Sequence, residues 1–215
     1  MKSFKHWKMQ EVEETFEVRE IGGHPLLTEW MSISCELSEN ERIQLEDLRL
    51  LLKKNVNLWN EAELKFKFLG PLLALAKYDN DNYRAFMERS LTVKSGEETA
   101  SGTVDFLIAK GRQIPRSPFF CIHEHKPDPS SSNDPLGQLL IGLEAIRQEN
   151  ASAGYNFPLY GAYVVGRFFY FVVFDGKTYA KSEPYVASQD DIFDIFCFLK
   201  QVKVYIDAII AEEQQ

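Results

Sequence analysis

One short segment limits the fold of this chain more than any other. The run Thr103-Val104-Asp105-Phe106-Leu107-Ile108-Ala109 is apolar except at its first and third positions. A strand that is apolar on both of its alternating faces is typical of a sheet covered on both sides. A carboxylate inside such a strand is costly unless it is paired or binds a cation. The segment therefore predicts an α/β protein in which Asp105 has a specific partner.

The next apolar run along the chain becomes charged at its end. Residues 118–126 have the composition of a strand, and the last three are Glu124-His125-Lys126. Side chains two apart on a strand share a face, so the Glu124 carboxylate and the Lys126 ammonium group should point to the same side. If the two strands are neighbours, Asp105 can meet this pair. Two carboxylates and one ammonium group are then expected to converge at a sheet.

This combination of groups suits one reaction class. Carboxylates from adjacent strands hold a hard divalent cation such as Mg²⁺ or Mn²⁺, which keeps water for exchange. Such a cation activates water and stabilises charge on a phosphate. A lysine beside it can orient the attacking water and offset negative charge. The residues therefore favour hydrolysis of phosphodiester bonds.

The same residues resemble the PD-(D/E)xK, or restriction-endonuclease-like, nuclease superfamily. Its core is αβββαβ with a mixed sheet, an acid on the second strand and (D/E)xK on the third. The match here is Gly102-Thr103-Val104-Asp105, then 18 intervening residues, then Glu124-His125-Lys126. Val104 stands where the family name has proline, which many members lack.

The resemblance implies roles for individual residues. Asp105 and Glu124 would ligate the metal, the backbone carbonyl of His125 would be a further ligand, and Lys126 would be the catalytic lysine. It implies a Mg²⁺- or Mn²⁺-dependent nuclease, with DNA favoured as the substrate over RNA and with both cleavage at strand ends and cleavage in the interior left open. Dimerisation stays open, although nucleases of this fold often pair to form homodimers that cut both strands.

Two further residues match the family only by their order in the chain. Many members place a glutamate on the first core helix, and Glu63 matches that position as a catalytic and metal-binding candidate. It also occupies the third position of a helix capped by Asn60 and lies four residues before Lys67, so a purely structural role is an equal alternative. Gln138, in the first turn of the helix after the third strand, resembles the glutamine that some branches use near the site.

The pattern along the chain gives the order β, α, α, β, β, β, α, β, β, β, α. Strands are expected at 11–20, 86–93, 102–109, 118–126, 158–165, 167–174 and 177–182, and helices at 39–54, 60–78, 134–150 and 188–210. We expect a single domain, 1–215, in which 60–166 is the nuclease-like core. Residues 1–59 would be an N-terminal β/α extension, and 167–215 would be a C-terminal hairpin and long helix.

Charge and cysteine content narrow the partners and the compartment. The net charge of -8 predicts weak, salt-sensitive and metal-dependent binding to nucleic acid rather than tight coating of it. Cys35, Cys121 and Cys197 are odd in number and lack CxxC spacing, so they are expected to be buried thiols in a reducing cytoplasm. The first residues lack an apolar signal segment, and the most hydrophobic stretch, 159–174, reads as two strands, so no membrane span is expected.

Two alternatives stay open. The chain could be a catalytically idle member of the same fold that serves as a binding or assembly module. It could also be a zinc-binding β-rich protein, because Cys121, His123 and His125 alternate along one strand face. Basic residues that could contact phosphate in the nuclease reading are Lys65, Lys67, Lys110, Arg112 and Arg116.

Overall fold

A mixed sheet forms the centre of the molecule. The computed structural model describes residues 2–96, 98–126 and 134–213, and within them the sheet has nine strands. They are β1 (Lys2–Ser3), β2 (Arg19–Glu20), β3 (Arg84–Ser95), β4 (Glu98–Lys110), β5 (Arg116–Lys126), β6 (Leu159–Val165), β7 (Phe168–Asp175), β8 (Thr178–Lys181) and β9 (Tyr185–Val186).

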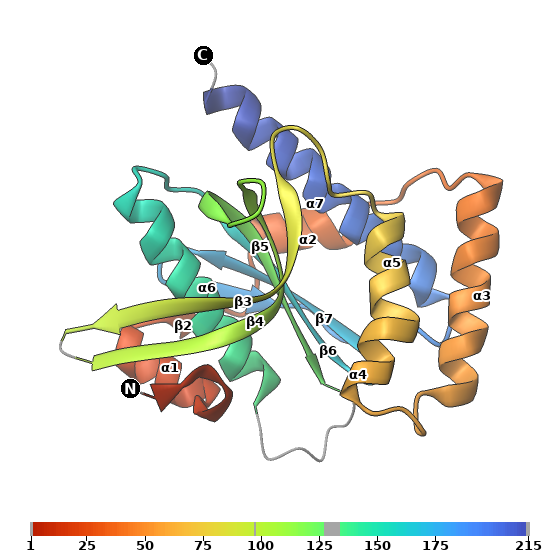
Figure 1. Cartoon of the computed structure of the whole chain (residues 1–215), viewed down its shortest axis with the longest axis horizontal. Helices are drawn as coiled ribbons and strands as arrows, with labels where there is room; N and C mark the ends of the chain where they lie inside the picture. Colours follow the sequence, from red (N-terminus) through yellow and green to blue (C-terminus); the bar gives the residue numbers. More distant parts are fainter. Residues whose placement is uncertain (1, 97, 127–133, 214–215) are drawn as a thin grey trace.

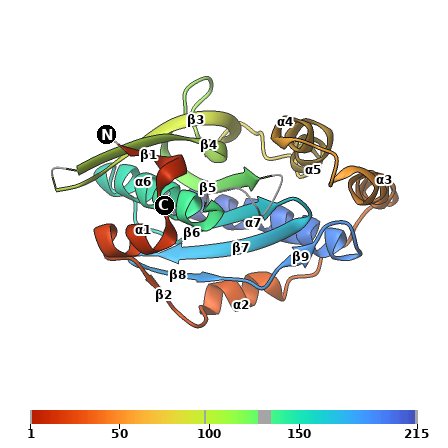
Figure 2. The same ribbon diagram turned by 90° about the horizontal axis from the view of Figure 1, so that it is seen from below.

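The strand order follows the chain over most of the sheet. β3, β4 and β5 form an antiparallel meander, β5 pairs with β6 in parallel, and β6, β7 and β8 continue antiparallel. β2 lies parallel to β8 at one edge, so that β6, β7, β8 and β2 follow one another in Figure 2. β1 pairs with β4, and β9 pairs with β7. The α/β class and the mixed sheet expected from the sequence are confirmed.

Helices cover both faces of this sheet (Figure 1). They are α1 (Met9–Phe16), α2 (Pro25–Met31), α3 (Glu39–Asn55), α4 (Glu61–Leu64), α5 (Gly70–Leu75), α6 (Pro135–Ser152) and α7 (Asp191–Glu213), with a 3-10 turn η1 (Phe4–His6) and a π-helical turn η2 (Lys65–Leu69). One apolar core lies between α6, α1 and the sheet. The other lies between the sheet and the helices α2, α3, α5 and α7.

Helix α6 makes the crossover from β5 to the parallel strand β6. It begins as the sequence predicts, because the Asp134 carboxylate caps the Gly137 N–H and Pro135 occupies the first turn. It packs closely on the sheet at Gly161, where an added Cβ would lie 3.1 Å from Leu143 Cδ1. Burying α6 this way covers one face of the strands that carry the candidate site.

The helical segment from α4 to α5 has a widened turn in its middle. Asn60 and Glu63 form the capping box that starts it. The N–H of Gly70 bonds to the carbonyl of Lys65, five residues earlier, in the π-helical turn η2. Pro71 follows and has no N–H to donate, which accounts for an irregular turn just before it. The helix expected at 60–78 is therefore divided by a π-helical turn.

The N-terminal region differs from the expected edge strand at 11–20. Most of it is helix α1, and only Arg19 and Glu20 pair as strand β2. Val12 and Phe16 are both buried in the core that α6 forms, whereas Glu14 between them is exposed; in a strand all three side chains would share one face. The strand prediction was wrong because the buried positions of this segment fit either a helix or a strand, and packing against α6 selects the helix.

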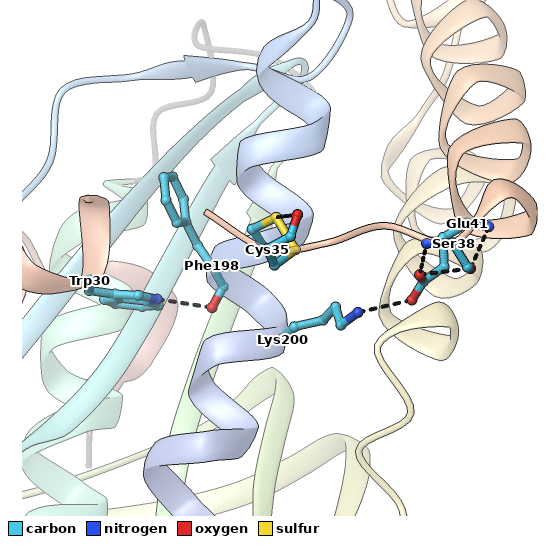
Figure 3. The surroundings of a disulfide bond; sticks show 7 residues. Trp30, Cys35, Ser38, Glu41, Phe198 and Lys200 are labelled. Carbon is cyan, nitrogen blue, oxygen red and sulfur yellow. Dashed lines mark hydrogen bonds and ion pairs between the residues drawn. A yellow bond between two sulfur atoms is a disulfide. The ribbon is translucent and has the colours of Figure 1, made fainter. Parts of the chain in front are cut away.

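The cysteines also depart from expectation. Cys35, between α2 and α3, forms a disulfide with Cys197 of α7, with a Cα–Cα distance of 5.4 Å (Figure 3). Two further contacts flank it, a bond from Trp30 Nε1 to the Phe198 carbonyl at 2.9 Å and the ion pair of Lys200 and Glu41 at 3.1 Å. Reading Cys35 and Cys197 as separate thiols is therefore wrong.

With that disulfide in place, cysteine usage no longer argues for a reducing compartment, because disulfides persist mainly in oxidising ones.

The most hydrophobic stretch, 159–174, forms the antiparallel pair β6 and β7, as predicted. Among the described residues, no helix has the length and apolar character needed to cross a membrane.

Candidate functional site

Asp105 lies where the ladders on both sides of β4 are interrupted. Between β4 and β5, pairing runs toward Asp105 only as far as Phe106 and His123. Between β3 and β4 the ladder skips Asp105, and Glu88, the residue across from it, has a left-handed φ of 51°. In this gap Asp105 Oδ2 accepts a 2.7 Å hydrogen bond from the main-chain N–H of His125. The carboxylate thus takes the place of a ladder bond and is fixed beside the Glu124-His125-Lys126 motif.

Glu124 and Lys126 share a face at the end of β5, as the strand period predicts. Lys126 Nζ lies 2.7 Å from Glu124 Oε1, and the two side chains are 10% and 5% exposed. Pairing with β6 continues through both residues and fixes their backbone. The pair is therefore buried, which separates it from the exposed ion pairs that are common at strand ends.

A second lysine enters from the helical segment. Lys65 Nζ lies 2.7 Å from Asp105 Oδ1 and 2.6 Å from Glu61 Oε1. Glu61 also faces Lys126, with 3.9 Å between Oε2 and Nζ. Acids and lysines thus alternate from the helix across two strands. We call these five residues, Glu61, Lys65, Asp105, Glu124 and Lys126, the carboxylate–lysine cluster.

The charges of the cluster do not balance. Three carboxylates face two ammonium groups, and all but Glu61 are largely buried. Burial and the neighbouring Asp105 carboxylate raise the pKa of Glu124 to about 7, against the opposing effect of Lys126. Burial lowers the pKa of Lys126, but Glu124 outweighs it and the net shift is upward. An unbalanced, buried carboxylate pair of this kind favours the arrival of a cation.

Lys65 is held in its charged form. Burial acts to lower the pKa of its ammonium group, but the hydrogen bonds to Asp105 and Glu61 outweigh burial and raise it. Its side chain is 17% exposed, so part of it reaches the surface. Lys65 is therefore a charged group in contact with both the cluster and the solvent.

Glu63 is not brought into the cluster. Its carboxylate accepts from the Asn60 N–H at 3.2 Å and pairs with Lys67 at 2.7 Å, on the exposed side of the helix. These are the contacts of the structural alternative. The glutamate that reaches the lysines of the site is Glu61, two residues earlier.

The apolar period of the helix could have identified Glu61. Leu64, Phe68 and Leu72 are buried and define the face that packs on the sheet. Glu61 precedes them by three, seven and eleven residues, so it lies on the same face, one turn before the core begins. Glu63 lies off that face. Matching the family by residue order alone does not distinguish these two faces of the helix.

Gln138 has a structural contact. It is 4% exposed, and its Nε2 donates to the Lys5 carbonyl at 3.2 Å. This bond fixes the N-terminal turn η1 against α6. The described contacts do not join Gln138 to the cluster, so its predicted role near the site stays a prediction.

The two histidines of β5 point their rings into the protein. The His123 ring packs 4.9 Å from the Phe106 ring, and the two histidine rings are 6.1 Å apart. Burial lowers the pKa of each to about 3. Both ring nitrogens of His125 are buried without a hydrogen-bond partner among the described residues.

The zinc alternative needs more ligands than these two rings. The side chain of Cys121 lies outside what the structure describes. Among the side chains that it does describe, no group of three or more His, Cys, Asp and Glu residues is arranged to hold a metal ion. Whether the His125 carbonyl serves as a ligand, as the resemblance implies, stays a prediction.

The donor chemistry of the cluster fits a hard cation. Asp105 and Glu124 supply carboxylate oxygens, and Mg²⁺ is commonly held by one or two carboxylates while it keeps several waters. In this structure ammonium groups occupy the oxygens that a cation would take.

The basic residues fall at two separate places. Lys65 and Lys67 belong to the turn beside the cluster. Lys110 lies opposite Arg116 in the β4–β5 strand ladder, at the end of that ladder away from Asp105. Asp105 lies five residues before Lys110, about 17 Å along an extended strand. Apart from Lys126 on β5, positive charge near the site therefore comes from the helix, not from the 111–115 loop.

Searches of known protein-family models and of curated proteins give no match for this chain. The functional proposal consequently rests on the geometry and the sequence motif.

Proposed function

We propose that this protein is a metal-dependent nuclease of the restriction-endonuclease-like type, which hydrolyses phosphodiester bonds, with DNA as the favoured substrate. The observation that carries the proposal is the convergence of Asp105, Glu124 and Lys126 at the point where β4 and β5 stop pairing. Glu61 and Lys65 join this group from the helix.

The order of elements supports the same proposal. The helical segment α4 to α5, the strands β3, β4 and β5, the helix α6 and the strand β6 follow one another as αβββαβ. They pair in the order β3-β4-β5-β6, with β5 and β6 parallel. The acid lies on the second of these strands and the ExK motif on the third, as in the superfamily core.

Each residue has a separate part in the proposed reaction. Asp105 and Glu124 would hold the cation, which supplies an activated water and stabilises charge on the phosphate. Lys126 lies beside Glu124 and can donate a hydrogen bond to the attacking water or to a phosphate oxygen. The His125 N–H fixes the orientation of Asp105, and Glu61 holds both lysines in place. This is positioning and charge stabilisation rather than covalent catalysis.

The deciding experiment is cleavage of linear and circular DNA, with RNA in parallel, in Mg²⁺, Mn²⁺ or chelator. We expect metal-dependent cleavage of DNA by the wild-type protein and its loss in Asp105→Asn, Glu124→Gln and Lys126→Met. Lys200→Met is the control, because Lys200 pairs with Glu41 on the α7 side and touches no residue of the cluster.

The possible outcomes separate the alternatives. No cleavage with any metal, together with retained DNA binding, would identify the idle binding module. Equal cleavage by wild type and by the three site variants would assign the activity to a contaminant. Stoichiometric zinc that survives dialysis and is lost in His123→Ala or His125→Ala would favour the zinc-binding alternative.

A further inference from the structure

Lys65 occupies the position on Asp105 that a metal ion would need. Asp105 Oδ2 is already used by the His125 N–H, which leaves Oδ1 as the oxygen that faces the cluster. Lys65 Nζ binds that oxygen at 2.7 Å. The Lys65 ammonium group thus neutralises the Asp105 carboxylate.

An ammonium group and a divalent cation cannot share this oxygen without strong repulsion. Mg²⁺ binds oxygen at about 2.1 Å, so the two like charges would come within a few ångström of each other in a largely buried site. Glu61 offers Lys65 a second partner at 2.6 Å, and Glu61 is 40% exposed. Lys65 can therefore leave Asp105 while it stays on the surface side of the cluster.

The charge of the cluster then changes sign. Its three carboxylates exceed its two ammonium groups by one negative charge. A bound divalent cation reverses this excess, and the displaced Lys65 ammonium group is a donor without its buried acceptor. A phosphate oxygen carries the charge and the lone pairs that such a donor needs.

We propose that Lys65 is a phosphate-binding residue of the substrate site, which holds Asp105 while the metal is absent and contacts a phosphate of the nucleic acid when the metal is bound. This inference rests on the proposed nuclease function. It adds a second lysine, from the helix, to the lysine of the ExK motif.

The first test measures metal binding without nucleic acid. Lys65→Met removes the competitor for Asp105 and should bind Mn²⁺ about three- to tenfold more tightly than wild type by calorimetry. Lys67→Met is the matched control, because it removes the same charge two residues away, from a lysine that pairs with Glu63 instead. Lys65→Gln is a second variant that retains a hydrogen-bond donor, and melting curves establish that each variant is folded.

The second test measures binding of a short DNA duplex in Ca²⁺ at several salt concentrations. Lys65→Met should weaken binding about tenfold and lower the slope of log affinity against log salt by about one. Lys67→Met should have the smaller effect on affinity.

The two tests separate this inference from the nuclease proposal. If the wild-type protein cuts DNA but Lys65→Met retains its metal affinity and salt slope, the role of Lys65 is overturned and the nuclease stands. If the wild-type protein neither binds nor cuts nucleic acid, the nuclease proposal and the phosphate contact both fail.

Discussion

The Asp105 carboxylate and the main-chain N–H of His125 are 2.7 Å apart, and this bond replaces a missing rung between β4 and β5. It gives Asp105 a structural role that is separable from its charge. Asparagine keeps an oxygen that can accept this bond, whereas alanine leaves a buried N–H without an acceptor. Two substitutions at one position therefore distinguish folding from chemistry.

We expect Asp105→Ala to lower the free energy of unfolding by about 1–3 kcal/mol more than Asp105→Asn does, because an unsatisfied buried donor carries that cost. Both variants should lose metal-dependent cleavage. Urea unfolding and the cleavage assay are the measurements. Equal stability of the two variants would mean that the carboxylate does not replace the ladder bond.

Glu61 and Glu63 provide a matched pair on one helical turn. Glu61→Gln removes the negative charge between Lys65 and Lys126 and should lower the cleavage rate about 10- to 100-fold, as expected for a residue that orients metal-site groups. Glu63→Gln keeps a residue suited to the capping box and removes only the exposed pair with Lys67. Its stability should change by no more than about 0.5 kcal/mol and its cleavage rate should stay at the wild-type level.

The comparison is made by single-turnover cleavage and thermal melting of the two variants. A loss of cleavage in Glu63→Gln with wild-type cleavage in Glu61→Gln would return the catalytic role to Glu63, as the residue order first suggested.

Elements with strong local signals were predictable from the sequence. The cap at Asp134 and the Pro135 that follows it give the start of α6, and the apolar runs give β4 and β5. The period of two placed Glu124 and Lys126 on one face without any knowledge of the fold. These features depend on neighbours in the sequence, which is why they could be read from it.

Features that depend on distant contacts were not predictable. Val12 and Phe16 fit a helix or a strand, and packing against α6 selects the helix. The pairing of Cys35 with Cys197 joins residues 162 positions apart, and spacing carries no information about it. The sequence alone does not distinguish Lys65 from the other basic residues, because its contact with Asp105 depends on how the helix packs against the sheet.

Glu144 predicts a pH dependence of stability away from the site. Its side chain is fully buried in α6 and accepts from Arg147 at 2.7 Å and Lys177 at 2.9 Å. Burial acts to raise the pKa of this carboxyl, but the bonds from Arg147, Lys177 and Gln148 outweigh burial and lower it below its ordinary value of 4.5. Its contribution to stability is therefore present above that value and is lost as the pH falls through the lowered folded-state pKa.

We expect Glu144→Gln to be less stable than wild type at pH 7 by about 1–3 kcal/mol, because it weakens two charge-assisted bonds. The difference should shrink as the pH is lowered below 4.5, because the carboxyl of the unfolded wild-type chain takes up a proton there while that of the folded protein, with its lowered pKa, still resists protonation. Urea unfolding of both proteins at about pH 7, 5 and 4 measures this difference in the free energy of unfolding. A difference that stays constant across this range would show that the Glu144 charge does not contribute.

The Cys35 and Cys197 disulfide should stabilise the protein by closing a long loop in the unfolded chain. The sequence separation is 162 residues, and bonds of this kind contribute about 2–5 kcal/mol. Cys35→Ser, or wild type in reductant, should therefore unfold at a lower urea concentration, with little change in cleavage, because the bond joins the α2–α3 connection to α7 and not to the cluster. Thiol titration of the unfolded protein, purified without reductant, should find one free thiol among the three cysteines. Three free thiols would mean that the bond does not form.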